Sequence, residues 1–368
     1  LRAQPAWRDT FLQSGTAPEP GDIFAQKDLA RSLRILATEG PDDFYQGTIA
    51  ERIASCMGKS GGLLAKEDLS RYEAEVLNPI RTKYRGLDVF EQPPVSQGHI
   101  LLEELNIVEG YDLSSLQPDG PDAVHLLVEA MKLAFADRHR YAGDPRFVGF
   151  RVDRIIDKKH AARRRSLIHS RKARATYPAQ GTSTSDTTYF AVADGEGNAV
   201  SFIQSLFHGF GSGLVVPGTG ILLNDRMAGF SLDPASPNVL AAGKRTVHTL
   251  NTYMVFHEGR PLFIGGTPGG DRQVQTNLQI ITRLLDWGMN VQQAVEAPRW
   301  ASAGGLLLHL ESRYPRPTVR ALCAMGHRVD QVGPWGAGGA VQLIMIHPAT
   351  RALIGGSDPR CDGCAIGF

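Results

Sequence analysis

The 368-residue sequence lacks several features that would assign a protein to a class at once. It has four cysteines, too few for a disulfide scaffold of this length. Only Cys361 and Cys364 form a CxxC pair, while Cys56 and Cys323 stand alone, so no metal site is expected. No apolar run reaches the roughly 18 residues of a transmembrane helix, so no membrane span is expected.

A bias of charge is also missing. Lys and Arg number 39 and Asp and Glu number 38, so the net charge is +1 and no global field favours nucleic acid or anionic membranes. One basic run, Lys158-Lys159-His160 followed by Arg163-Arg164-Arg165, has no interleaved aromatic residues. We therefore expect a solvated helix face there, and no nucleic acid as partner.

Three common catalytic or cofactor motifs fail on their spacing. Gly58-Lys59-Ser60 is no phosphate loop, because the first glycine of that motif would fall at Ile53. A serine-hydrolase elbow centred on Ser212 would need a glycine at Phe210. His257-Glu258 has no second histidine four residues on, so it is no zinc motif. No cofactor is expected.

Helical periodicity dominates the first half of the chain. It predicts helices over residues 26–38, 48–57, 100–108 and 122–141, a short helix from Glu67, and two later ones over 274–287 and 291–296. Asp122 is placed to cap the longest helix, and Gly40 lies near the end of the first. Residues 1–22 are expected to form a loop. A lone helical histidine such as His125 or His139 is more often structural or solvated than a ligand, so neither is assigned a role.

Paired strands follow from Thr187 onward. Alternating segments flank turn residues at 189–193 and 199–204, at 250–256 and 261–265, and at 341–346 and 352–355. One more strand is expected over 84–90. Repeated hairpins with packing helices predict an α+β protein built from layered sheets covered by helices.

The stretch from Ser185 to Phe190 lies between a polar, basic, flexible run and a strand. A threonine at the junction between a flexible linker and a strand suits a self-cleaving hydrolase, because the backbone of the linker can be strained and its peptide bond before the threonine broken. The new N-terminal threonine would carry both nucleophile and base, since its α-amine has a pKa of about 7.7–8.0. By itself, a Thr-Thr pair before a strand is more often a consequence of β propensity.

A glycine-rich turn, residues 265–271, follows a predicted strand and precedes a predicted helix. Its backbone N–H groups could form a phosphate cradle, an oxyanion hole or merely a turn. The phosphate motifs do not fit its spacing. An oxyanion hole from Gly269 and Gly270 would complete a threonine nucleophile.

Many short motifs occur in one order along nearly the whole chain. They include Gly40-Pro41-Asp42-Asp43-Phe44-Tyr45-Gln46-Gly47, Lys66-Glu67-Asp68-Leu69, Ala136-Asp137-Arg138, Thr187-Thr188-Tyr189, Gly197-Asn198-Ala199-Val200, Gly220-Ile221-Leu222-Leu223-Asn224, Pro268-Gly269-Gly270 and Ser357-Asp358-Pro359-Arg360. This set resembles the γ-glutamyltransferase family of N-terminal-nucleophile (Ntn) hydrolases.

The resemblance implies an αββα sandwich and autocleavage between Asp186 and Thr187. The precursor would yield a large subunit, residues 1–186 with a linker over 169–186, and a small subunit, residues 187–368. By position, Thr187 is the nucleophile, Ser205 stands where the family keeps a supporting threonine, and Gly269 and Gly270 form the oxyanion hole. An acyl-enzyme would then pass its acyl group to water or to an amine.

The sequence departs from the family at its substrate site. The family's asparagine two positions past Ser205 is Phe207, and the glutamine and aspartate that hold the γ-glutamyl α-amine fall on Arg226 and Gly229. The family's Ser-Ser pair falls on His248-Thr249. The predicted substrate-binding residues are Asn224, Arg226, His248 and Thr249. We expect Arg226 to pair with a carboxylate of a substrate that lacks the α-amine.

The leading hypothesis is an autoprocessed threonine acyltransferase or amidohydrolase acting on γ-glutamyl or related dicarboxylic-acid amides. An enzyme similar to cephalosporin acylases or oxamate amidohydrolases is one alternative, and an inactive homologue serving as a binding module is another. The family's N-terminal portion has no counterpart here. Sheet edges exposed by its absence would favour association, so a homo-oligomer is one expectation. The cytoplasm is favoured, unless a signal precedes Leu1.

Overall fold

The computed structural model describes residues 1, 4–12, 15–175 and 185–368. These residues form two compact units that each have their own core. The first unit comprises Leu1–Leu77 and Leu206–Arg226, and the second comprises Asn78–Ser205 and Met227–Phe368.

The first unit is mostly helical. It contains α1 (Pro5–Phe11), α2 (Lys27–Glu39), α3 (Asp42–Gln46), α4 (Thr48–Lys59), α5 (Lys66–Ser70) and the two short paired strands β5 (Val215–Val216) and β6 (Ile221–Leu222). The apolar face of α4 packs against α5 and β5, which buries Ile49, Ile53, Leu69 and Val216. The predicted helices over 26–38 and 48–57 are confirmed, and Gly40 ends α2 with a positive φ of 88°.

The prediction of a loop over residues 1–22 is wrong in part, because Pro5–Phe11 is a helix, whereas no helix lies in the described residues 15–22. Pro5 occupies the first helical turn, where its missing N–H costs nothing. Aromatic contacts then hold the helix in place: the rings of Trp7 and Phe11 lie 5.3 and 5.2 Å from the ring of Phe210. Phe210 is distant in sequence, so local patterns could not reveal this packing.

A six-stranded antiparallel sheet forms the centre of the second unit. Its order is β1 (Ile80–Tyr84), β2 (Leu87–Glu91), β7 (Thr252–His257), β8 (Arg260–Gly266), β12 (Gln342–Ile346) and β13 (Leu353–Ser357). The hairpins predicted around 257–260 and 347–351 are confirmed. The single strand predicted over 84–90 is wrong, because Arg85 and Gly86 take positive φ values and turn the chain back, pairing β1 with β2.

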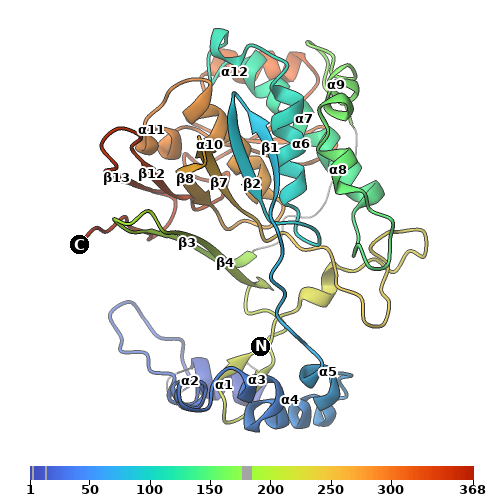
Figure 1. The fold of residues 1–368 in the computed structure, drawn as a ribbon, viewed down its shortest axis with the longest axis vertical. Coiled ribbons are helices and arrows are strands. Elements are labelled where there is room, and N and C mark those ends of the chain that lie inside the picture. Colours follow the sequence, from blue (N-terminus) through green and yellow to red (C-terminus); the bar gives the residue numbers. More distant parts are fainter. Residues whose placement is uncertain (2–3, 13–14, 176–184) are drawn as a thin grey trace. The chain divides into compact units, whose positions relative to one another are not determined.

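Helices cover one face of this sheet (Figure 1). They are α6 (Gly98–Val108), α7 (Pro121–Tyr141) and α10 (Arg272–Leu285), accompanied by η1 (Leu113–Ser115), α8 (Val152–Ile155), α9 (Lys158–Arg165) and α11 (Val291–Glu296). All of α6 is buried. Asp122 does not cap α7: Gly120 is the N-cap, Pro121 begins the helix, and the Asp122 carboxylate binds Arg171 instead.

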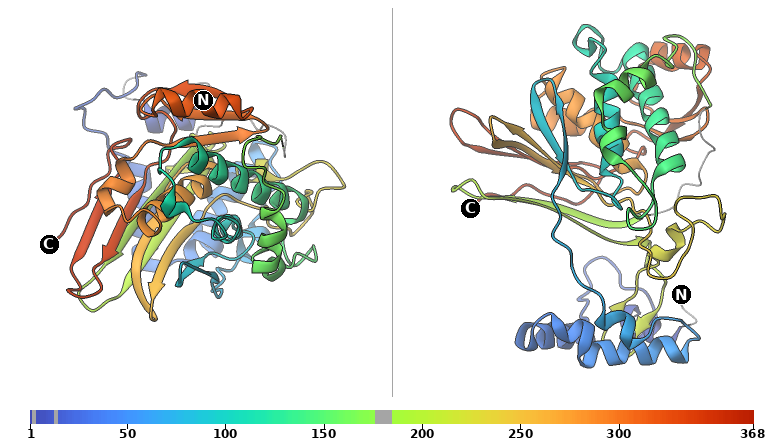
Figure 2. Two further views of the ribbon diagram at one scale, coloured as in Figure 1. Left: turned by 90° about the horizontal axis from the view of Figure 1, so that it is seen from above. Right: turned by 45° about the vertical axis from the view of Figure 1, so that its right-hand side comes forward.

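A two-stranded sheet lies on the other face (Figure 2). It pairs β3 (Ser185–Ala193) with β4 (Ala199–His208), as the sequence predicts for the hairpin around 194–198. β3 packs against β8 and β12 of the larger sheet. Two stacked antiparallel sheets with helices on the larger one agree with the predicted layered α+β fold.

A third sheet lies against the helices. β9 (Trp300–Gly304), β10 (Leu307–Glu311) and β11 (Arg328–Val332) form it, and α12 (Arg316–Ala324) connects the parallel strands β10 and β11. Sequence patterns missed these strands. The η2 turn (Arg226–Gly229) spans the boundary between the two units.

The predicted solvated face of the basic run is wrong in part. His160 and Arg164 of α9 both bind the carboxylate of Asp137, which is buried in α7. Lys158 binds Glu109 and the side chain of Asn106, each at 2.5 Å. The contacts of Lys158, His160 and Arg164 therefore attach α9 to the helix layer, although Lys158 is itself exposed.

The two units do not follow the predicted division at residues 186 and 187. The second unit contains sequence from both sides of that point. A subunit boundary created by cleavage is a chemical feature, whereas these units reflect packing, so the predicted large and small subunits remain a prediction.

Candidate active site

Thr187 lies near the start of β3, and its hydroxyl donates a 2.9 Å hydrogen bond to the hydroxyl of Ser205 on the paired strand β4. Both residues belong to the second unit and are partly buried. The sequence predicted these two residues as nucleophile and supporting hydroxyl. The side chains of the neighbouring Ser185 and Asp186 lie outside the described residues.

The side chain of Thr187 lies on the face of β3 that points toward the six-stranded sheet. Alternate residues of a strand share a face, so Thr187 and Tyr189 point the same way. Tyr189 is buried and lies against Gly266 at the end of β8: a β-carbon on Gly266 would come within 2.5 Å of the Tyr189 ring. The Tyr189 hydroxyl is held by Ser201 at 2.8 Å. Gly266 therefore leaves space for the residue that orients this end of β3.

The glycine turn that follows β8 has a backbone that only glycine adopts easily. Gly269 has a φ of 135° and Gly270 a φ of 58°. Their carbonyl oxygens accept hydrogen bonds from the first N–H groups of α10, at 3.0 Å from Arg272 and 3.1 Å from Gln273. Within the described part of the chain, no hydrogen bond uses the N–H groups of Gly269 and Gly270 themselves. Such donors at a helix N-terminus suit a negatively charged oxygen.

Buried amide side chains support this turn, and no sequence pattern indicated them. The Gln97 amide donates to the carbonyl oxygens of both Thr249 (2.8 Å) and Gly270 (3.1 Å). The Asn251 amide donates to Thr249 and to Gln273 of α10, at 3.0 Å each. All three amide side chains are fully buried. The Gln97 Oε1 and Gln273 Nε2 atoms have no hydrogen-bond partner within the described residues, but the bonds that are made tie the backbone of the turn to buried side chains.

An ion pair also attaches the glycine turn to α7. Arg138 near the end of α7 binds Asp271 at 2.5 Å, directly after Gly270. Arg138 is one of the motif residues that carry the family resemblance, and this contact gives it a structural reason. The turn is thus attached to α6, α7 and β7 as well as to its own helix.

His248 and Thr249 lie just before β7. The His248 N–H donates to Val95, and its carbonyl accepts from Gln97, which pairs this stretch with the loop before α6. Thr249 is buried. The structure therefore brings Thr249 next to the glycine turn through Gln97, while the predicted role of both side chains in binding substrate remains a prediction.

Asn224 and Arg226 belong to the first unit. The Asn224 side chain accepts a hydrogen bond from the N–H of Arg226 at 2.9 Å. The Arg226 guanidinium stacks over the Phe207 ring, 4.5 Å from its centroid, and burial lowers its pKa. The two departures from the family pattern at Phe207 and Arg226 are therefore in contact with each other.

The motif at Ser357–Arg360 is structural. Asp358 accepts from Arg299 at 2.5 Å and from Arg360 at 3.0 Å, and Arg360 also binds Glu311 at 2.7 Å. These side chains are fully buried. Asp358 further accepts from the N–H of Val341, so the network ties β12 to the third sheet.

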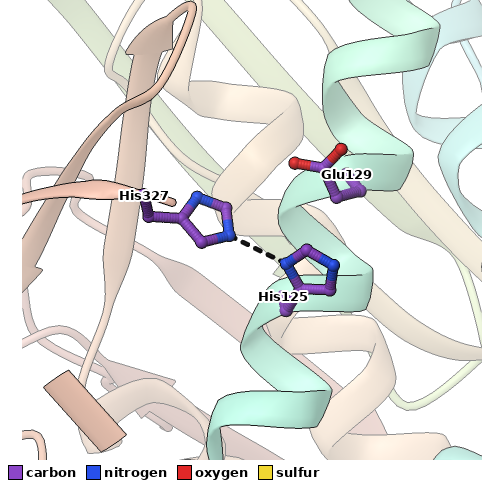
Figure 3. A group of neighbouring side chains, drawn as sticks. All are labelled: His125, Glu129 and His327. Carbon is purple, nitrogen blue, oxygen red and sulfur yellow. Dashed lines mark hydrogen bonds between the residues drawn. The ribbon is translucent and has the colours of Figure 1, made fainter. Parts of the chain in front are cut away.

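Two groups of side chains in the described residues come close enough to hold a metal ion. They are His125, Glu129 and His327, drawn in Figure 3, and Glu103, Asp137 and His160. Neither group includes a residue of the predicted active site. Among the described helices, none combines the length and apolar character of a membrane span.

A threonine hydroxyl at the head of a strand, paired with a second hydroxyl in stacked antiparallel sheets below helices, defines the class of the Ntn hydrolases. Within that class, the chain belongs to the gamma-glutamyltranspeptidase family, whose family model matches residues 1–368. The predicted family is confirmed.

Similar proteins agree with this assignment. The glutathione hydrolase-like YwrD proenzyme of Bacillus subtilis is 40% identical over all of this chain and 70% of its own length. The acylase ACY 1 proenzyme of Pseudomonas sp. (strain SE83) is 39% identical over all of this chain and 65% of its own. The crystal structure of cephalosporin acylase from Bacillus halodurans matches with a TM-score of 0.92 and 40% identity, over 98% of this chain and 66% of its own. The predicted Ntn fold is confirmed, and the chain spans about two thirds of the length of these relatives.

Proposed function

We propose that the chain is an autoprocessed amidohydrolase or acyltransferase that uses Thr187 as its nucleophile. The hydrogen bond between Thr187 and Ser205 carries this proposal. It orients the hydroxyl of the threonine that the resemblance predicts as the nucleophile. The names of the two relatives, both proenzymes, support maturation by cleavage.

Autoprocessing would begin with attack of the Thr187 hydroxyl oxygen on the carbonyl carbon of Asp186. The peptide C–N bond breaks as an ester C–O bond forms, and the hydroxyl proton moves to the departing nitrogen. Water then hydrolyses the ester, which leaves a carboxylate on Asp186 and restores the Thr187 hydroxyl. The product has a free α-amine on Thr187 that can accept a proton near neutral pH.

In turnover, the same hydroxyl would attack the carbonyl carbon of an amide substrate while the α-amine takes its proton. The oxyanion of the tetrahedral intermediate would be bound by the N–H groups of Gly269 and Gly270, and each such donor is worth about 2.7–4 kcal/mol. The amine leaves after taking up that proton. The acyl group remains as an ester on Thr187 until water or a second amine removes it.

We further propose that the acyl group is a dicarboxylic acid, of the glutaryl or γ-glutamyl type. By its position in the family pattern, Arg226 would bind the distal carboxylate of this acyl group. The Phe207 ring packs against the guanidinium, and Asn224 accepts from the backbone N–H of Arg226. Gly229 provides no carboxylate for an α-ammonium group. This favours glutaryl amides. The acylase among the relatives supports an acyl amide as substrate, without specifying the acyl group. Glutathione-like γ-glutamyl amides are the second candidate, supported by the glutathione hydrolase-like relative.

Denaturing gels test the processing step. Wild-type protein should resolve into two fragments that meet between Asp186 and Thr187 by mass spectrometry. Thr187→Ala should remain a single chain with unchanged secondary structure. A wild-type chain that is active while uncut would overturn the proposal.

Anilide substrates test the acyl group. We expect glutaryl-4-nitroanilide to be hydrolysed with a higher kcat/KM than γ-glutamyl-4-nitroanilide. Arg226→Gln should lower kcat/KM for the glutaryl substrate about 10- to 100-fold, because a charge-assisted hydrogen bond is lost. A strong preference of the wild type for the γ-glutamyl substrate would contradict the glutaryl assignment and leave the threonine mechanism intact.

A further inference from the structure

One face of α7 binds the stretch of chain that leads toward the predicted cleavage site. Asp122, His125, Glu129 and Lys132 recur at helical spacing, and each has a partner within residues 169–174. The last three are buried. The sequence predicted a flexible linker from residue 169 onward, so the attachment of residues 169–174 corrects that prediction; residues 176–184 lie outside the described part.

Glu129 and Lys132 hold both backbone groups of Arg174. The N–H of Arg174 donates to the two Glu129 carboxylate oxygens at 3.3 and 3.2 Å. Its carbonyl oxygen accepts from the Lys132 ammonium at 3.1 Å. Lys132 also binds Glu129 at 2.8 Å, and the two side chains are 1% and 3% exposed. A buried ion pair this well satisfied, with its partners on the backbone rather than on a side chain, fixes where the main chain runs.

Two further contacts extend this attachment. His125 binds the carbonyl oxygen of His169 through Nε2 at 2.8 Å, and its Nδ1 lies 2.9 Å from Nε2 of His327. Ala173 donates its N–H to the carbonyl of Met325 at 2.7 Å. Burial, with Lys132 and His125 nearby, lowers the pKa of His327 to about 3, so His327 is neutral.

Figure 3 shows His125, Glu129 and His327 as a group that could be taken for a metal site. The contacts argue against a resident cation. Both Glu129 oxygens already accept hydrogen bonds, and the Lys132 ammonium lies beside them where a metal would add a second positive charge. The group is better explained as part of the attachment of residues 169–174.

We propose that Glu129 and Lys132 are positioning residues for autoprocessing: they anchor the chain upstream of the scissile bond. This inference rests on the proposed function. Downstream, β3 is paired with β4 and holds Thr187. Upstream, only residues 175–186 separate the Arg174 anchor from the bond after Asp186. A chain held at both ends samples fewer conformations, so the Asp186 carbonyl meets the Thr187 hydroxyl more often.

The test replaces the ion pair by apolar side chains of similar volume, Glu129→Leu with Lys132→Met. Such exchanges are often neutral for stability, whereas removal of one partner is not. We expect the freshly purified full chain to process at least tenfold more slowly than wild type, as measured by the appearance of the two fragments. Its melting temperature and its activity per mole of cleaved chain should match the wild type. Asp122→Asn, which removes the charge from the exposed contact to Arg171 on the same segment, is the control and should process normally.

Processing of the double variant at the wild-type rate would overturn this inference while leaving the proposed function standing. A loss of activity per cleaved chain in step with processing would also overturn it, since that result indicates general distortion. If the wild type is never cleaved, the autoprocessing in the proposed function fails, and the anchor fails with it. Zn²⁺ that raises the melting temperature of wild type but not of His327→Gln would assign the group to a metal and overturn the anchor.

Discussion

The side-chain amide of Gln97 donates a hydrogen bond to the carbonyl oxygen of Gly270 at 3.1 Å, from the residue just ahead of α6. The same amide group holds the carbonyl of Thr249. Three stretches of chain that are far apart in sequence therefore meet at one buried side chain. Gly270 is a predicted oxyanion donor through its N–H, which belongs to the peptide before it. The bond from Gln97 fixes the next peptide, which carries the Gly270 carbonyl, and so restricts the backbone that orients this donor.

Gln97→Leu keeps the volume of the side chain and removes both donors. The glycine turn should then lose its fixed orientation, and we expect kcat to fall about tenfold with KM changed less than about twofold. Steady-state kinetics on fully processed protein measure this. The matched control is Gln292→Leu, which removes an amide bonded to Glu296 and Ser357 instead. A Gln97 variant with an unchanged kcat would show that the turn is held without it.

Ser205→Ala removes the acceptor of the Thr187 hydroxyl bond. We expect both processing and turnover to slow about tenfold, the rate equivalent of roughly 1.4 kcal/mol. Ser205→Thr retains a hydroxyl and restores the residue type that the family keeps, so it should remain within about twofold of wild type. Equal losses in the two variants would mean that the hydroxyl itself is not needed.

Gly266→Ala places a methyl group 2.5 Å from the ring of Tyr189. Either the ring or the strand must move, and overpacking of this kind costs about 1–3 kcal/mol. Because Tyr189 shares its face of β3 with Thr187, we expect processing to slow more than tenfold along with a lower free energy of unfolding. Gly195→Ala, in the turn between β3 and β4, is the control, because a β-carbon there would meet no atom within 4 Å. A normally processed Gly266→Ala chain would disprove the link between the two positions.

Local signals predicted much of this fold, and nonlocal contacts account for what was missed. The helix Val291–Glu296 matches its predicted bounds, because Asn290 and Gln293 form a capping box that the sequence itself encodes. The parallel pairing of Leu307–Glu311 with Arg328–Val332 was missed, since it joins strands across an intervening helix. Gln97 was missed for the same reason: its partners lie about 150 residues away in the sequence.

The residues of the candidate site also fall into two groups, those that sequence motifs predict and those that only the tertiary structure reveals. Thr187, Ser205 and the glycine turn follow from short motifs, and the structure brings the first two into contact. The supports of the turn, Gln97, Asn251 and Arg138, emerge only from the packing of α6, β7 and α7 around it. Sequence motifs mark the reacting groups, whereas the groups that orient them depend on tertiary structure.

Glu104 offers a test of the buried helix α6. Its side chain is fully buried, its two oxygens have no hydrogen-bond partner within the described residues, and burial raises its pKa well above the ordinary value. The folded protein therefore keeps this carboxyl protonated at a pH where the unfolded chain has released the proton. The unfolded state binds fewer protons, so this group's contribution to the free energy of unfolding falls as the pH rises above about 4.5.

Glu104→Gln removes this titration while keeping the shape of the side chain. We expect the variant to match wild type in stability near pH 4.5 and to exceed it increasingly at higher pH, by about 1.4 kcal/mol per pH unit while the folded state keeps the proton. Urea denaturation at several pH values measures the difference. The exposed Glu39 is the control, and Glu39→Gln should leave the pH dependence unchanged. A Glu104→Gln curve parallel to wild type would show that the carboxyl is ionised in the folded state and paired with a cation.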